Sequence, residues 1–280
     1  REKTDGAIME KRCEQTLLIL TNFLGRGYDK SGFHAMMDDR WMEDDMELKI
    51  EHLQKHFEKK TVLRDINYSF SQGKIYGLLG RNGAGKTTLF NCLNQDLPID
   101  SGRFYLVSED GKEFPLGVDH IGYVLSTPQV PEFLTAREFL KFFLEINEQQ
   151  IPDPQPIDAY FDFINIEKED RDRLLKDFSH GMKNKMQMLI NIIAHPKVLL
   201  LDEPLTSLDV VVAEEMKEIL RELKKDSILI LSTHIMELAL DLCDEIVLLN
   251  HGVLSEVPQQ AEEEIMRAHI LSALREEDHV

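Results

Sequence analysis

A short glycine-rich segment carries the residues of this chain that are best suited to bind phosphate. Residues 80–87 read Gly-Arg-Asn-Gly-Ala-Gly-Lys-Thr, the phosphate-loop pattern of two glycines separated by four residues and followed by Lys and Thr. An apolar run at 75–79 predicts a strand before the loop, and residues 88–93 predict a helix after it. Glycines let the backbone approach phosphate closely, and the N–H groups at the helix start form a nest for anions. We expect Lys86 to contact the β- and γ-phosphates of a nucleotide and Thr87 to hold Mg²⁺; the alternative is a glycine-rich turn without a ligand. The predicted nucleotide-binding residues here are Gly80, Asn82, Gly83, Ala84, Gly85, Lys86, Thr87 and Thr88.

A second segment adds two carboxylates at the end of an apolar run. Residues 198–201 are Val-Leu-Leu-Leu, and Asp202 and Glu203 follow directly. Such a run predicts a buried parallel strand, whose carboxyl end lies where open α/β sheets bind ligands. We expect Asp202 to reach Mg²⁺ and Glu203 to orient or deprotonate the water that attacks the γ-phosphate. The alternative is an acidic pair that simply ends a strand at the surface.

A third segment between these two resembles a known family. Residues 178–185 read Phe-Ser-His-Gly-Met-Lys-Asn-Lys, which is similar to the signature of ABC transporter ATP-binding subunits, Leu-Ser-Gly-Gly-Gln followed by basic residues. Ser179 and Gly181 are kept, whereas Phe178, His180 and Met182 depart from the signature. The resemblance implies that Ser179 and the N–H groups after it bind the γ-phosphate of nucleotide held by the other subunit of a dimer. A plain Ser helix cap is the alternative.

Further residues match the family in its own order, from about Leu48 to Val257. The resemblance places Asp209 at the position that crosses the dimer. It gives His234, directly after the predicted strand 228–233, a catalytic role beside Glu203: contact with the γ-phosphate and retention of the attacking water. Phe57 stands where the family has an aromatic residue that stacks on adenine. Taken alone, His234 would more often be structural and Phe57 would more often be core.

One position departs from the family pattern near the predicted metal site. The family has a Gln there that ligates Mg²⁺, and a gap-free alignment between Tyr123 and Thr135 places Ser126 at that position. Gln129 is the other candidate, if the loop is shifted by three residues. A Ser hydroxyl is a shorter and poorer ligand, so we expect slower hydrolysis or looser coupling if Ser126 is used. The predicted metal residues are Thr87, Asp202, and Ser126 or Gln129.

Composition narrows the class of protein. The net charge is −19 and the pI about 4.9, which argues against a broad nucleic-acid surface because phosphate backbones require basic patches. The 3 cysteines show no metal-binding spacing and indicate a reducing cytosol. No apolar run approaches the ~20 residues of a membrane-spanning helix, so we expect a soluble chain that would need a separate membrane subunit for transport.

The pattern along the chain predicts an α/β fold, a P-loop NTPase core with a mixed or parallel sheet, an N-terminal antiparallel β subdomain and an α-helical subdomain. We expect an N-terminal extension at 1–45, an ATP-binding domain at 46–257 and an acidic tail at 258–280, with the helical subdomain at about 136–192. Parallel strands are expected near four ranges, 75–79, 198–202, 228–232 and 246–249. In the tail, a terminal helix is expected to turn three residues inward, Ile265, Leu271 and Leu274.

The resemblance implies an ATP-binding and ATP-hydrolysing subunit that powers a membrane ABC transporter of the bacterial exporter type. Its cofactors would be ATP and Mg²⁺. Its partners would be a transmembrane permease and a second copy of itself or a paralogous ATPase, with no nucleic acid. It would be cytoplasmic and peripheral on the cytoplasmic face of the membrane. Two alternatives remain: a soluble ATPase switch of the same family, and a regulatory ATP-binding module that hydrolyses weakly.

Overall fold

The computed structural model describes residues 46–58, 60–148, 151, 154–206, 208–258 and 263–275. The predicted extension at 1–45 lies outside these residues. The chain divides into two compact units. In the described residues, one unit, here the sheet unit, comprises 46–126 and 191–275, and the other, here the helical unit, comprises 127–190.

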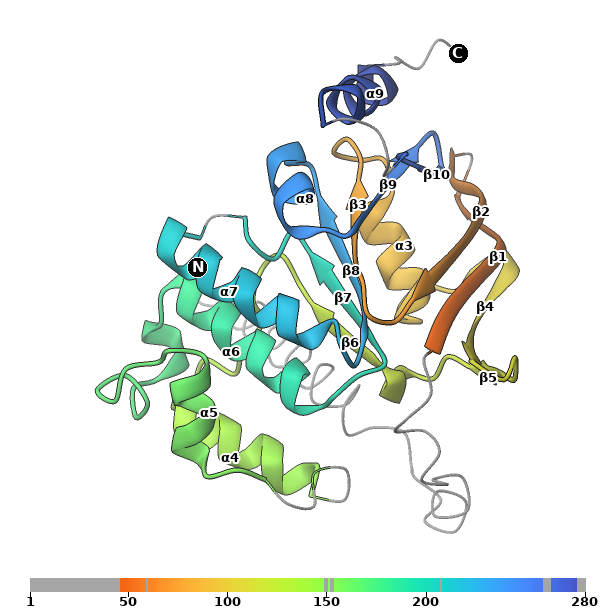
Figure 1. The fold of residues 1–280 in the computed structure, drawn as a ribbon. Coiled ribbons are helices and arrows are strands. Elements are labelled where there is room, and N and C mark those ends of the chain that lie inside the picture. Colours follow the sequence, from red (N-terminus) through yellow and green to blue (C-terminus); the bar gives the residue numbers. More distant parts are fainter. Residues whose placement is uncertain are drawn as a thin grey trace, which may run out of the picture. The chain divides into compact units, whose positions relative to one another are not determined.

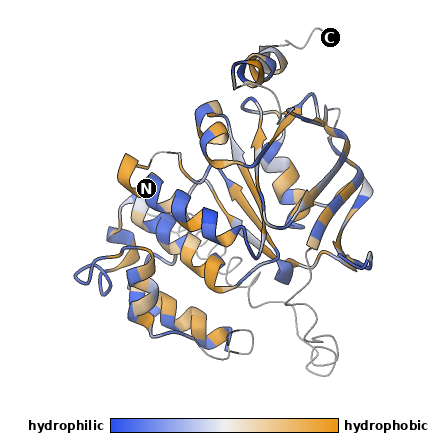
Figure 2. Cartoon of the chain, in the orientation of Figure 1, coloured by the Kyte–Doolittle hydropathy of each residue, from blue (hydrophilic) through white to orange (hydrophobic). Residues whose placement is uncertain are grey.

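The sheet unit contains a six-stranded sheet in the order β10-β9-β3-β8-β7-β6 (Figure 1). Its strands are β3 (Ile75–Leu79), β6 (Ile121–Val124), β7 (Val198–Asp202), β8 (Ile228–Thr233), β9 (Glu245–Asn250) and β10 (Val253–Glu256). All neighbours are parallel except β10, which pairs antiparallel with β9. The four predicted parallel strands are confirmed as β3, β7, β8 and β9. They are buried on both faces, which explains why their sequences are mainly apolar (Figure 2).

An antiparallel sheet in the order β2-β1-β4-β5 confirms the predicted N-terminal β subdomain. Its strands are β1 (Met46–Phe57), β2 (Lys60–Ser71), β4 (Ser101–Ser108) and β5 (Glu113–Pro115). Buried and half-buried side chains alternate at the start of β1, as expected for a strand with one face toward the core. Helix α3 (Lys86–Leu93) lies between this sheet and the six-stranded one (Figure 1).

Helices α7 (Val210–Leu223), α8 (Met236–Leu242) and α9 (Glu263–Arg275), with the 3-10 turn at Val118–His120, complete the sheet unit. Lys217 of α7 pairs with Asp241 of α8 at 2.6 Å.

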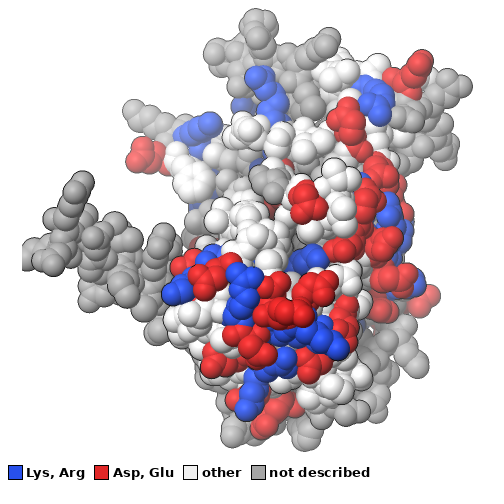
Figure 3. Space-filling model, turned by 90° about the vertical axis from the view of Figure 1, so that its left-hand side faces the viewer, with Lys and Arg blue, Asp and Glu red and all other residues white. Residues whose placement is uncertain are grey.

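On the face drawn in Figure 3, acidic and basic side chains lie intermixed. No helix among the described residues is both long and apolar enough to span a bilayer.

The prediction for the buried face of the terminal helix is wrong. In α9, Ile270 is fully buried and Met266 and Ala273 are partly buried against a cluster from β3, β9 and α8. Ile265 and Leu271 are 58% and 40% exposed, and the side chain of Leu274 lies outside the described residues. Met266, Ile270 and Ala273 are spaced i, i+4, i+7 and share one face, whereas Ile265 and Leu271 lie beside it.

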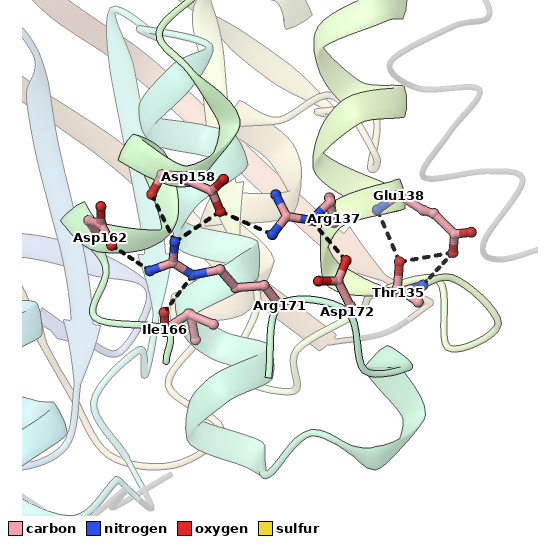
Figure 4. Close-up of polar contacts among 8 residues, drawn as sticks. All are labelled: Thr135, Arg137, Glu138, Asp158, Asp162, Ile166, Arg171 and Asp172. Atoms are coloured by element: carbon pink, nitrogen blue, oxygen red, sulfur yellow. Dashed lines mark hydrogen bonds and ion pairs between the residues drawn. The ribbon is translucent and has the colours of Figure 1, made fainter. Parts of the chain in front are cut away.

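The helical unit contains α4 (Ala136–Ile146), α5 (Ile157–Phe163), a 3-10 turn (Leu175–Asp177) and the first residues of α6 (His180–Ile193). Thr135 caps α4 by accepting the N–H of Glu138, whose carboxylate accepts the N–H of Thr135 in return (Figure 4). Phe139 and Phe143, two apolar residues of α4, are buried.

A buried guanidinium connects α5 to the loop that follows it (Figure 4). Arg171 is 3% exposed, donates to the carbonyl of Ile166 at 3.0 Å and to the carboxylate of Asp158 at 2.9 Å, and also pairs with Asp162. Arg137 shares Asp158, at 3.0 Å. Because one planar fork satisfies several acceptors at once, Arg171 holds α5 against the loop that follows it.

We expect Arg171→Ala to lower the melting temperature by about 3–6 °C, since it removes several hydrogen bonds and a buried side chain together. Arg171→Lys should recover little, because a single ammonium cannot replace the fork. Arg173→Ala is the matched control: Arg173 is half exposed and pairs with Asp170 three residues away. Equal melting temperatures for Arg171→Ala and Arg173→Ala would contradict this role of Arg171.

Candidate functional site

Three neighbouring parallel strands bring the predicted catalytic residues to one edge of the sheet. β3, β8 and β7 are adjacent, and residue Leu79 pairs with Thr233, while Asp202 pairs with Ser232. The phosphate loop follows β3, Glu203 follows β7 and His234 follows β8. The carboxyl edge of such a sheet is where α/β folds bind ligands.

A cavity of about 380 Å³ opens at this edge. This volume is in the range of pockets for small ligands. Its lining comprises Phe57, Val62, Asn82, Gly83, Gly85, Lys86, Thr87, Thr88, Ser126, Asp202 and Glu203. Most of the residues that the sequence assigned to nucleotide and metal therefore surround one space.

The loop before α3 has a backbone that only glycine adopts easily. Gly83 and Gly85 have φ of +82° and +109°. A side chain on Gly80 would place its Cβ 2.7 Å from the carbonyl of Leu249, so the loop also needs the small residue there. Helix α3 starts at Lys86 without a side-chain cap, which leaves the N-terminal end of the helix to an anionic ligand.

Lys86 supplies a cation at the floor of the cavity. Its Nζ donates to the carbonyl of Gly80 at 2.7 Å and lies 3.9 Å from Oε1 of Glu203. Burial lowers the pKa of Lys86 below its ordinary value, and the carboxylates of Glu203 and Asp202 act in the opposite direction. Bound phosphate would add negative charge beside this ammonium and favour its protonated form.

Asp202 sits between two hydroxyls. It accepts from Oγ1 of Thr87 at 2.8 Å and from Oγ of Ser232 at 2.5 Å. Sequence reasoning missed Ser232, although its place one residue before the end of β8 pairs it directly with Asp202 once β7 and β8 are neighbours. Ser232 thereby fixes one carboxylate oxygen and leaves the other toward Thr87.

Glu203 has a left-handed backbone conformation, and each oxygen of its carboxylate has a partner. Its φ is +51°, a left-handed value that is strained for a residue with a side chain and that clusters at functional sites. One carboxylate oxygen lies 2.8 Å from Nδ1 of His234, and the other accepts from Oγ1 of Thr206 at 3.0 Å. Ser232 holds the backbone, since its carbonyl accepts the N–H of Glu203 at 3.1 Å. The arrangement aims a carboxylate at the cavity and orients it through His234.

The oxygens of Thr87 and Asp202 suit Mg²⁺. Mg²⁺ prefers oxygen ligands and is commonly held by one or two carboxylates together with substrate phosphates. Thr87 and Asp202 supply one hydroxyl and one carboxylate, a set of oxygens that fits a metal arriving with a phosphate ligand.

The two alternatives for the remaining metal-side residue lie in different units. Ser126 lines the cavity, whereas Gln129 belongs to the helical unit. The position of Ser126 is compatible with its predicted role. The choice between Ser126 and Gln129 stays a prediction.

The two residues predicted to act across a dimer both begin helices. Oγ of Ser179 accepts from the N–H of Met182 at 3.2 Å at the start of α6, and Gly181 is in the first turn. Asp209 caps α7 by accepting from the N–H groups of Val211 and Val212 at 3.1 and 3.0 Å. Both caps form within a single chain. The roles of Ser179 and Asp209 toward a second copy therefore stay predictions.

Phe57 stands at the cavity as the predicted base platform. Its side chain is 43% exposed, and Nζ of Lys55 lies 5.4 Å from the ring centroid. An exposed aromatic face beside a phosphate-binding loop can stack on a purine.

Phe57→Ala should weaken ATP binding by about 5- to 100-fold, the range expected for the loss of one base–aromatic stack. Phe57→Tyr should bind ATP as the wild type does, since it keeps the ring. Isothermal titration with ATP measures both. An unchanged affinity in Phe57→Ala would show that the base does not stack there.

Comparison with known proteins points to one family. The family model described as ABC transporter matches residues 63–206, a range that includes the phosphate loop, the signature segment and the Asp202–Glu203 pair. An uncharacterized ABC transporter ATP-binding protein of Methanocaldococcus jannaschii is 33% identical over 209 residues, 73% of this chain and 74% of that protein. A lantibiotic transport ATP-binding protein of Streptococcus pyogenes is 32% identical over 210 residues, 73% of this chain and 87% of that protein.

Similarity extends to a relative that is named as an importer subunit and to solved structures. A sulfate/thiosulfate import ATP-binding protein of Agrobacterium fabrum is 32% identical over 213 residues, 74% of this chain and 62% of that protein. The solved structure of cbiO1 from Clostridium perfringens, part of the ABC transporter complex cbiONQ, superimposes with a TM-score of 0.63 at 26% identity. That match covers 80% of this chain and 94% of the solved chain.

Proposed function

This chain belongs to the ABC transporter family of ATP-binding proteins and is an ATPase of that family, and we propose that it powers a membrane transporter as one of two cooperating ATP-binding subunits. Residues 46–257 would form the ATP-binding domain, with 1–45 and 258–280 as additions to it.

The observation that carries the proposal is the Glu203 carboxylate, held 2.8 Å from His234 and 3.9 Å from the Lys86 ammonium beside the cavity. Glu203 would accept a proton from the attacking water or orient that water, and His234 would keep the carboxylate in position. Lys86 and the N–H groups at the start of α3 would bind the phosphates. Mg²⁺, held by Thr87 and Asp202, would neutralise charge on the β- and γ-phosphates.

Two copies facing head to tail would complete each site. Ser179, Gly181 and Asp209 would approach nucleotide bound by the other copy, and the start of α6 directly after Ser179 supports this because the N-terminus of a helix favours anions. Loss of the γ-phosphate would remove these contacts and let the dimer open, as in other γ-phosphate switches. The second copy would be identical or a paralogous ATPase.

We propose export as the direction of transport and a transmembrane permease as the partner, with the chain on the cytoplasmic face of the membrane. The departures at His180, Met182 and Ser126 support export, because they resemble divergent exporter ATPases.

The test is purification of the tagged chain from detergent-solubilised membranes of its own cells, followed by reconstitution with the co-purified polytopic protein in lipid vesicles. We expect ATP turnover per chain to change when the membrane protein is present. Lys86→Ala serves as the control without activity. Association with ribosomes, or turnover that is indifferent to any membrane protein, would instead favour a soluble ATPase switch.

A further inference from the structure

The end of β1, which carries Phe57, is not fixed by its sheet alone. β1 pairs with β4 only as far as Gln54 and Ser101, so residues 55–57 pair with β2 on one edge only. The pairing with β2 is itself irregular, with register shifts on both sides of Lys55. Strand pairing thus leaves the direction of the Phe57 ring loosely determined.

The loop between α3 and β4 covers this open edge. A carboxylate oxygen of Asp100 accepts the backbone N–H of His56 at 2.5 Å, and the N–H of Asp100 donates to the carbonyl of Gln54 at 3.0 Å. Nζ of Lys55, a residue that is 7% exposed, donates to the carbonyl of Pro98 at 2.6 Å and lies 3.6 Å from Asp100. The side chain of Asp100 therefore takes the place of a missing strand partner at the residue immediately before Phe57.

The charges around Asp100 favour this arrangement. Nδ1 of His56 lies 3.2 Å from the same carboxylate oxygen. The N–H of His56, together with the His56 ring and Lys55, lowers the pKa of Asp100 below its ordinary value, so the carboxylate is ionised at neutral pH. An ionised acceptor makes the stronger hydrogen bond to a backbone N–H.

We propose that Asp100 is a positioning residue for the adenine base: it holds the end of β1 so that Phe57 presents its ring to the nucleotide. Asp100 does not line the cavity, and it acts only through His56 and Phe57. The inference rests on the proposed binding of ATP. Asp100 lies 43 positions from Phe57 in the sequence. Its proposed role involves no contact with the nucleotide.

The experiment compares two ligands, Mg²⁺–ATP and Mg²⁺–tripolyphosphate, by isothermal titration. Tripolyphosphate retains the phosphate contacts and lacks the base. We expect Asp100→Ala to weaken ATP binding by about three- to tenfold, less than the loss of the whole stack, and to leave tripolyphosphate binding unchanged. Asp100→Asn keeps an oxygen at the same place and should recover most of the affinity for ATP.

A double-mutant cycle separates positioning from general loss of structure. In a Phe57→Ala background, Asp100→Ala should cost no further ATP affinity, since the ring it positions is already absent. Asp110→Ala is the matched control: Asp110 caps the β4–β5 turn through Ser108 and Lys112 and should leave binding of both ligands unchanged. If Asp100→Ala does not fold, Asp100→Ser takes its place. The side chain of Ser is shorter than that of Asp.

The outcomes distinguish this inference from the proposed function. Wild-type protein that binds neither ligand would overturn the proposed function and this inference with it. If the wild type binds both, then equal weakening of ATP and tripolyphosphate in Asp100→Ala, unchanged ATP affinity, or additivity with Phe57→Ala would overturn the role of Asp100 alone.

Discussion

Lys86→Ala should abolish tight binding of ATP, with a loss of affinity of at least about 100-fold. The Nζ of Lys86 is buried at the cavity floor and points to the carbonyl of Gly80 and the carboxylate of Glu203. Removing it leaves two carboxylates, Asp202 and Glu203, facing a triphosphate without the buried cation that offsets their charge. Equilibrium titration with ATP in the presence of Mg²⁺ measures the loss.

Lys217→Ala is the matched control for this substitution. It also removes a lysine from the sheet unit, one that pairs with Asp241 and Glu214 away from the cavity. Its affinity for ATP should equal that of the wild type. Unchanged affinity in Lys86→Ala would mean that the phosphate loop is misassigned.

Glu203→Gln should reduce turnover by about 100- to 10,000-fold while ATP stays bound, because the amide keeps the shape of the carboxylate and loses its basicity. The amide oxygen can still accept from Thr206, so the local structure should persist. With ATP bound and not hydrolysed, the contacts proposed for Ser179 across the dimer remain, and the variant should accumulate as a dimer. Steady-state turnover and sedimentation velocity with ATP measure the two effects.

The control for Glu203→Gln is Glu237→Gln, an exposed glutamate on α8 that pairs with Arg267. It should hydrolyse ATP normally and show no ATP-trapped dimer. A Glu203→Gln protein that stays monomeric and keeps wild-type turnover would refute the catalytic assignment of Glu203.

The sequence predicted the parts of the fold whose physical cause is local. The apolar runs of β7 and β8 end in polar residues, and the apolar run of β3 leads into the phosphate loop, so these runs identify both the strands and the edge where the site lies. The strand β6 was missed because it has 4 residues and includes Gly122, too short a pattern to identify a strand by itself.

Features that depend on distant contacts could not be predicted from the pattern. Ser232 becomes a partner of Asp202 only when two strands 30 residues apart are placed side by side. The left-handed backbone of Glu203 belongs to the turn after β7. A Glu at that position does not predict this conformation. In α9 the apolar residues lie on more than one face, and contacts with β9 and α8 decide that Ile270 is the buried one.

The most direct test of the account is Mg²⁺-dependent ATP turnover by the wild type, measured per chain over a wide range of protein concentration. If two copies complete each site, turnover per chain should rise with protein concentration, reach a plateau, and vanish when Mg²⁺ is chelated. Turnover per chain that is independent of concentration would contradict the head-to-tail arrangement. Absence of turnover at every concentration would contradict hydrolysis by the isolated pair of subunits.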